Sequence, residues 1–308
     1  MSRGRATATG FGAVLLWAAL ALFTVATGGV PPFQLTAVCF TIGGLIGVAW
    51  IAMSGRGLAA LRGLPPAVWI VGIGGLFGYH FCYFTALKLA PPAQASLIAY
   101  LWPLLIVLFS GLLPGETLRP QHVVGALVAF AGAALVVAGP GASFAWPHLP
   151  GYAAAAACAL IWSAYSLLSR RLGAAPTETV AVFCLATAVL SLVAHLALET
   201  TAWPAGALGW LALLALGLGP VGLAFYLWDV GCKRGDIQLL GTASYAAPLV
   251  STLILVAAGF AEATPTLIVA ATLIAGGALL AARAGKVRAS GPSPGSRGRA
   301  RPAPPTRG

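Results

Sequence analysis

Tyrosine, tryptophan and histidine side chains recur inside the long apolar stretches of this sequence. Tyr79 follows Gly75 by four residues and precedes Tyr83 by four, so these residues share one face of a helix. Aromatic rings with a few hydroxyl groups and no opposing charge can bind a neutral or zwitterionic molecule that has an apolar body. We therefore expect a ligand of this kind between the helices.

The residues predicted to line a substrate-binding cavity are Trp17, Tyr79, His80, Tyr83, Tyr100, Trp102, Trp162, Tyr165, Ser244 and Tyr245. They lie inside apolar stretches, where a phenol or indole N–H needs a hydrogen-bond partner. Trp146 and Trp203, at the ends of stretches, are instead typical of a membrane–water interface. Ordinary core packing is the alternative for each inward ring. His80 could also carry a proton, or simply pack with one hydrogen bond.

Two prolines and one possible ion pair also lie within these stretches. Pro103 and Pro248 are predicted hinges, because a proline inside a helix frees a carbonyl group and kinks the helix. Simple tolerance of proline in membrane helices is the alternative. Asp229, near the end of its stretch, is expected to pair with Lys233, four residues later.

Several functional classes lack the residues that they need. The sequence has no Walker loop, no Ser–His–Asp set and no His, Asp or Glu cluster with metal-ligand spacing. We therefore expect neither an enzyme nor an ATP-driven pump, and neither a metal nor a cofactor. No Lys or Arg is predicted at the middle of the membrane, which argues against phosphorylated cargo.

The composition predicts an all-α integral membrane protein. Hydrophobic residues make up 59% of the chain and charged residues only 7%, too few to coat a water-exposed globule. Apolar stretches of about 20 residues, the length that spans a bilayer, recur ten times. The predicted transmembrane helices are 10–27, 31–53, 67–88, 92–112, 120–139, 151–171, 176–198, 205–231, 236–259 and 265–284.

Positive charge predicts the orientation. Of the 17 Lys and Arg residues, Lys88 alone is expected outside, so both termini are predicted in the cytoplasm. Residues 286–308 read as a disordered basic tail at the cytoplasmic face of the membrane, and we expect no nucleic acid to bind.

The sequence repeats at an offset of 145 residues. Trp17 aligns with Trp162, Lys88 with Lys233, Tyr100 with Tyr245, and Pro103 with Pro248. Residues 1–145 and 146–285 would each form a unit of five helices. Because five is odd, the second unit must cross the membrane in the opposite sense. Inverted repeats of this kind are typical of secondary transporters.

The segment from Tyr83 to Leu105, YFTALKLAPPAQASLIAYLWPLL, is followed by Glu116 and by GALVAFAG at Gly125 to Gly132. This pattern resembles the EamA-type members of the drug/metabolite transporter superfamily, and the string at Tyr100 to Pro103 resembles their YddG-type aromatic amino-acid exporters. The resemblance implies a basket-shaped fold of inverted repeats, a central cavity, and export of aromatic and other amino acids. Residues 233–238, KRGDIQ, depart from the family pattern because they lack its proline.

The sequence therefore predicts a secondary transporter that exports amino acids, favouring aromatic ones, by alternating access through an aromatic-lined cavity. A broad-specificity drug or metabolite efflux transporter is the alternative. We expect a monomer that crosses the inner (plasma) membrane many times, with the lipid bilayer and a small-molecule substrate as its partners. Proton antiport and facilitated diffusion both remain open as the driving force.

Overall fold

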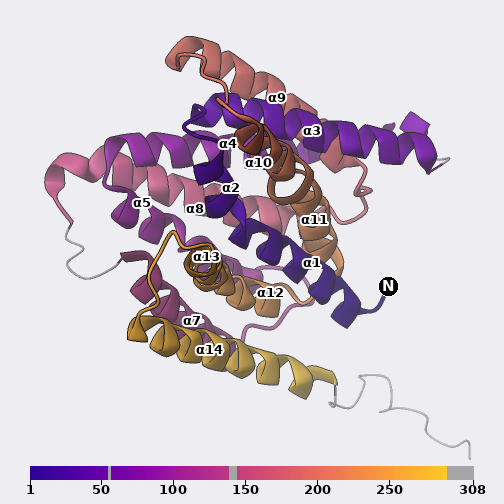
Figure 1. Ribbon diagram of the computed structural model, residues 1–308. Coiled ribbons are helices and arrows are strands. Elements are labelled where there is room, and N and C mark those ends of the chain that lie inside the picture. The colour runs from indigo at the N-terminus through magenta and orange to yellow at the C-terminus, as the bar shows by residue number, and fades with distance from the viewer. Residues whose placement is uncertain (55–56, 139–143, 290–308) are drawn as a thin grey trace, which may run out of the picture.

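The computed structural model describes residues 1–54, 57–138 and 144–289, and over this part of the chain it is all-helical (Figure 1). Ten spans within these residues are long and apolar enough to cross a membrane, which confirms the predicted number. The first span begins at Arg3 and not at residue 10. The Ser2 hydroxyl caps this helix by accepting a hydrogen bond from the Arg5 N–H, so the helix starts before its apolar part.

Some spans are single helices and others are broken. The single ones are α3 (Pro32–Met53), α4 (Pro66–Leu89), α7 (Pro120–Ala138), α8 (Leu149–Arg171), α9 (Thr179–Leu198) and α14 (Pro265–Ala289). The broken ones are α1 and α2 (Arg3–Ala18, Leu20–Ala26), α5 and α6 (Pro92–Ala99, Trp102–Ser110), α10, η3 and α11 (Ala207–Leu218, Gly219–Leu223, Ala224–Arg234), and α12 and α13 (Ile237–Ala243, Ala246–Ala257). Short 3₁₀ turns are η1 (Gly57–Leu61) and η2 (Trp146–His148).

The breaks in the fourth and ninth spans fall at corresponding places in the repeat. One lies at Tyr100 and Leu101, the other at Ser244 and Tyr245, so the breaks are 144 residues apart and share the equivalent pair Tyr100 and Tyr245. Pro103 and Pro248 follow in the first turn of α6 and α13. A helix tolerates proline there, because the N–H groups of a first turn have no partner within the helix. Their role as hinges stays a prediction.

The main helix contacts join the first half of the chain to the second. The most extensive ones pair α7 with α14, α4 with α8, α3 with α9, and α1 with α11, and α6 also packs on α12. Figure 1 shows α7 beside α14 at the bottom of the view and α3 beside α9 at the top. Small residues permit close approach: a Cβ atom at Gly231 of α11 would lie 2.6 Å from the Gly10 Cα of α1. The two halves therefore share one core.

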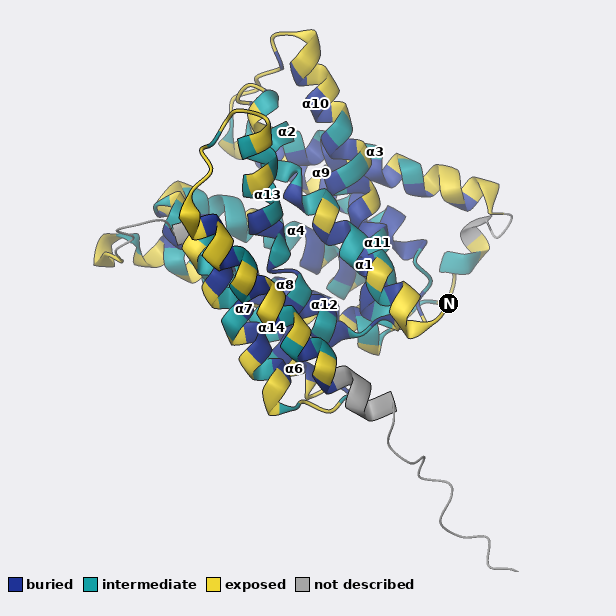
Figure 2. Cartoon of the chain, turned by 60° about the horizontal axis from the view of Figure 1, so that its bottom comes forward, coloured by how far each residue is buried: buried dark blue, intermediate teal, exposed yellow. Residues whose placement is uncertain are grey.

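The outer faces of the helices are apolar and exposed. Figure 2 shows the inner faces buried, whereas the outward faces of α14, α3 and α10 are exposed. Large exposed apolar side chains include Ile70 of α4, Leu196 of α9 and Leu208 of α10. Apolar surface of this extent suits contact with lipid.

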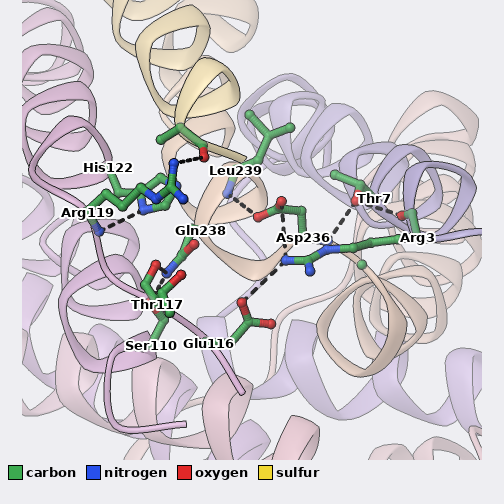
Figure 3. A network of polar contacts seen from close by, with 12 residues as sticks. Arg3, Thr7, Ser110, Glu116, Thr117, Arg119, His122, Asp236, Gln238 and Leu239 are labelled. Carbon is green, nitrogen blue, oxygen red and sulfur yellow. Dashed lines mark hydrogen bonds and ion pairs between the residues drawn. The ribbon is translucent and has the colours of Figure 1, made fainter. Parts of the chain in front are cut away.

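A polar network joins the ends of several spans (Figure 3). The Glu116 carboxylate, in the connection from α6 to α7, accepts hydrogen bonds from Arg170 of α8 and Arg3 of α1. Arg3 also pairs with Asp236, 3.3 Å away, at the start of α12. Arg170 donates to the carbonyl groups of Cys232 and Gly235 where α11 ends.

Candidate functional site

Four tryptophan side chains from four different spans meet at the centre of the protein. This tryptophan cluster consists of Trp17 of α1, Trp102 of α6, Trp162 of α8 and Trp228 of α11. Each ring contacts the other three, with centroid distances from 5.1 to 6.4 Å. Such contacts are favourable for tilted, edge-to-face and offset rings. Aromatic faces are thereby assembled from both halves of the chain.

Hydrogen bonds hold the cluster in place. The indole N–H of Trp17 donates to the Pro220 carbonyl over 3.0 Å, inside the π-helical turn η3. The indole N–H of Trp228 donates to the Ser166 hydroxyl over 3.1 Å, and the Ser163 hydroxyl donates to the backbone carbonyl of Trp102. A π-helical turn leaves carbonyl groups outside the regular ladder, and such turns are frequent at functional sites.

The predicted tyrosines of α4 extend the cluster on one side. The Tyr79 ring lies 5.1 Å from that of Trp162 and stacks on Tyr83 at 6.0 Å. The Tyr83 hydroxyl is 3.3 Å from the Ser96 hydroxyl of α5. Tyr100, at the break between α5 and α6, lies near Tyr79 and Tyr83. The structure therefore brings these tyrosines together beside the tryptophans.

His80 is held on the same helix but turns to another neighbour. Its Nδ1 lies 2.7 Å from the Leu76 carbonyl, and its ring meets Phe40 edge-on at 5.0 Å. It also contacts Phe225 of α11 at 6.1 Å, and Phe225 contacts Trp17 and Trp162. His80 thus borders the cluster through Phe225.

The remaining predicted residues lie apart from the tryptophan cluster or at its edge. Tyr165 is fully buried and packs on Trp162 at 5.1 Å. The Tyr245 ring packs on Phe130 of α7, and the Ser244 hydroxyl donates to the Leu240 carbonyl of its own span. Ser244 and Tyr245 therefore belong to the crossing of the fourth and ninth spans and not to the aromatic centre.

Two aromatic residues of the centre, Trp228 and Phe225, are absent from the predicted set. The repeat offset could have found both, because Trp228 corresponds to Tyr83 and Phe225 to His80. Tyr83 and His80 both belong to the predicted set. Their equivalents in the eighth span do not share their residue type, so only position in the repeat identifies them.

Next to Trp228, the structure buries a charged pair. The Asp229 carboxylate lies 2.8 Å from the Lys233 ammonium, which confirms the predicted pairing, and only 1% of Asp229 is exposed. The Thr177 hydroxyl donates to the same carboxylate over 2.7 Å. Buried charges need partners of this kind, because an unpaired one is costly in an apolar medium.

Comparisons with known proteins agree on one family. The model of the EamA-like transporter family matches twice, over residues 5–138 and 149–283. The aromatic amino acid exporter YddG of Ancylobacter novellus is 60% identical over 283 residues, covering 91% of this chain and 98% of that protein. YddG of Salmonella typhimurium is 27% identical, with 82% of this chain and 88% of that protein covered. A crystal structure of a 59% identical protein has a TM-score of 0.88 and covers 92% of this chain and 100% of the other.

Proposed function

Because the chain belongs to the EamA-like transporter family, we propose that it exports aromatic amino acids from the cytoplasm as a secondary transporter. The tryptophan cluster carries this proposal: aromatic rings from four spans converge where a membrane carrier would hold its cargo. Rings in edge-to-face and stacked geometry suit an aromatic side chain. The names of the YddG relatives support the same cargo.

In this proposal the aromatic ring of the transported amino acid packs against the tryptophan cluster and the tyrosines beside it. The binding residues would be Trp17, Tyr79, Tyr83, Tyr100, Trp102, Trp162 and Trp228. Tyrosine hydroxyl groups at the edge of the cluster would meet the amino and carboxyl groups of the cargo. The half-buried Tyr83 hydroxyl, next to Ser96, is a donor and acceptor suited to that task.

Alternating access through inverted repeats forms the second part of the proposal. The main helix contacts are symmetric when each span of the first unit is replaced by the corresponding span of the second. The pair of α4 and α8 then corresponds to the pair of α11 and α1. The pairs α7 with α14, α3 with α9, and α6 with α12 each join two corresponding spans. The breaks in the fourth and ninth spans fall at matching positions, and the family model matches each half once. Two similar halves in opposite senses give one site two states of similar energy.

The chain would lie in the inner (plasma) membrane with both termini in the cytoplasm. Ten apolar spans support the multi-pass arrangement, and the distribution of Lys and Arg supports the orientation. The network around Glu116 and Arg170 would then close the cytoplasmic end, and Glu199, which accepts from the N–H groups of Phe33 and Gln34, would lie at the outer end.

Efflux from proteoliposomes tests the cargo. Vesicles loaded with labelled tryptophan should release it in a saturable manner, and unlabelled phenylalanine should compete. Trp162→Ala and Tyr100→Ala should lower the rate at least tenfold, whereas Trp146→Ala, at a ring that is 85% exposed, should not. Equal transport of analogues that lack the amino or carboxyl group would favour the broad efflux alternative. Efflux no faster than from tryptophan-loaded vesicles without the protein would refute the proposal.

A further inference from the structure

We propose that the buried Asp229 carboxylate, paired with Lys233, is the proton-binding site through which a proton gradient drives export. The inference rests on the proposed export function and adds its driving force. Charged side chains inside membrane spans are costly and commonly mark ion or proton pathways. Asp229 lies within the eighth span, five residues before its end, and is 1% exposed.

The contacts of the pair favour a proton over a metal cation. One oxygen of Asp229 lies 2.8 Å from the Lys233 Nζ, and the other accepts from Thr177 over 2.7 Å. The Lys233 ammonium also donates to the Ala175 carbonyl over 2.9 Å. It therefore occupies the place next to the carboxylate that a bound cation would take. The species that can still come and go at this carboxylate is a proton.

A small pocket opens beside the pair. The centre of a water molecule has about 10 Å³ of free space in this pocket, the lower limit for holding one water. Hydroxyl-bearing side chains, Ser169 of α8 and Thr179 of α9, line it together with Asp229 and Lys233. Its remaining walls include Val68, Val71 and Phe183. One water held by these hydroxyl groups would suffice to pass a proton to the carboxylate.

The titratable and charged groups nearest Asp229 come from α8 and α11. They are Tyr165 of α8 and Cys232, Lys233 and Arg234 of α11. One step farther out, Arg170 of α8 lies near Cys232, Cys184 of α9 lies near Tyr165, and Glu178 follows Thr177 at the start of α9. Arg3 of α1 pairs with Glu116 and Asp236. Helix α4 faces the pocket with Val68 and Val71. Among the described residues that line the pocket, Asp229 is the one carboxylate.

Helix α11 links the proton site to the aromatic centre. Trp228 belongs to the tryptophan cluster, and Asp229 is the next residue. The π-helical turn η3 precedes α11, and its Pro220 carbonyl accepts from Trp17. On α8, Tyr165 packs on Trp162 and also lies near Asp229. A shift of α11 that rearranges Trp228 for cargo therefore also rearranges Asp229.

The proposed step is a single protonation. A proton from the acidic side binds a carboxylate oxygen of Asp229 and forms an O–H bond, so the attraction to the Lys233 ammonium is lost. When α11 shifts, the same O–H bond breaks, the proton leaves to the other side, and the ion pair forms again. A proton thus crosses in the direction opposite to the amino acid.

Gradient-driven uptake into proteoliposomes tests this inference. With the membrane potential clamped, an acidic vesicle interior should drive labelled tryptophan inward above its external concentration in the wild type. Asp229→Asn should accumulate at least tenfold less tryptophan than the wild type. Glu262→Gln is the matched control, because it makes the same chemical change at an exposed carboxylate between α13 and α14. That variant should accumulate tryptophan like the wild type.

A second variant keeps the carboxylate, in case Asp229→Asn does not fold. Thr177→Val removes a donor to the ionised form, so Asp229 should take up its proton at higher pH. The pH of half-maximal accumulation should therefore rise. Tryptophan flux that ignores the gradient, gradient-driven accumulation that survives in Asp229→Asn, or an unchanged pH profile in Thr177→Val would overturn the inference. Complete absence of tryptophan flux in the wild type would instead refute the proposed function.

Discussion

The phenolic hydroxyl of Tyr245 accepts a hydrogen bond from the backbone N–H of Leu104 over 3.0 Å. Leu104 lies in the first turn of α6, where an N–H group has no partner within the helix. Tyr245 lies at the break between α12 and α13. One side chain of the ninth span therefore completes the hydrogen bonding of the fourth span where the two spans cross.

Tyr245→Phe should destabilise this crossing. The substitution keeps the buried ring but leaves the Leu104 N–H without its acceptor, which costs about 1–3 kcal/mol for a buried donor. Thermal unfolding in detergent micelles measures the effect. Tyr152→Phe is the control, because its hydroxyl accepts from the Ala145 N–H at an exposed site where water can replace it. Equal melting temperatures for the two variants would contradict this account.

Gly231→Ala should separate α1 from α11. An added Cβ atom would meet the Gly10 Cα at 2.6 Å, and two backbones cannot yield without moving a whole helix. Overpacking of this kind costs about 1–3 kcal/mol. Gly276→Ala in α14 is the matched control, since nothing lies within 4 Å of its Cβ position. Alanine there should be neutral or stabilise by up to about 1 kcal/mol. The denaturation midpoint of Gly231→Ala should therefore fall, whereas that of Gly276→Ala should stay or rise.

Glu116→Gln should weaken the polar network that Figure 3 shows. The carboxylate side chain is 4% exposed and bonds both Arg3 and Arg170, so the neutral amide leaves two guanidinium groups with a poorer acceptor. We expect a loss of about 1–3 kcal/mol in the free energy of unfolding. Glu262→Gln, on the exposed connection before α14, should lose almost nothing. A change of equal size in both variants would show that the network does not stabilise the fold.

Pro103→Ala tests the predicted hinge. Alanine restores a backbone N–H after the break at Tyr100 and Leu101 and favours a continuous fourth span. If the break serves as a hinge, the efflux rate should fall several-fold while the melting temperature stays nearly unchanged. Pro265→Ala, at the start of the unbroken α14, should leave the efflux rate as it is. An efflux rate equal to that of the wild type in Pro103→Ala would contradict the hinge prediction.

Sequence periodicity and composition were sufficient for the ten spans. Each span is encoded locally by an apolar run of bilayer length, so its position needs no knowledge of its neighbours. Trp17 and Trp162 could be selected together because the repeat places both, and the structure puts their rings 5.6 Å apart. The Asp229–Lys233 pairing could also be predicted from the sequence, because residues four apart are neighbours on one face of a helix.

Tertiary structure decided which of these residues meet. Tyr245 and Tyr100 are equivalent in the repeat, yet only Tyr100 lies beside the aromatic centre, because Tyr245 turns toward α7 and the fourth span. Trp228 joins the tryptophan cluster because close contact between Gly10 and Gly231 sets α11 against α1. Burial of Asp229 likewise depends on α8, α9 and Thr177, which lie far away along the chain. The direction in which a helix face points is set by its packing partners, and a single helical stretch does not encode them.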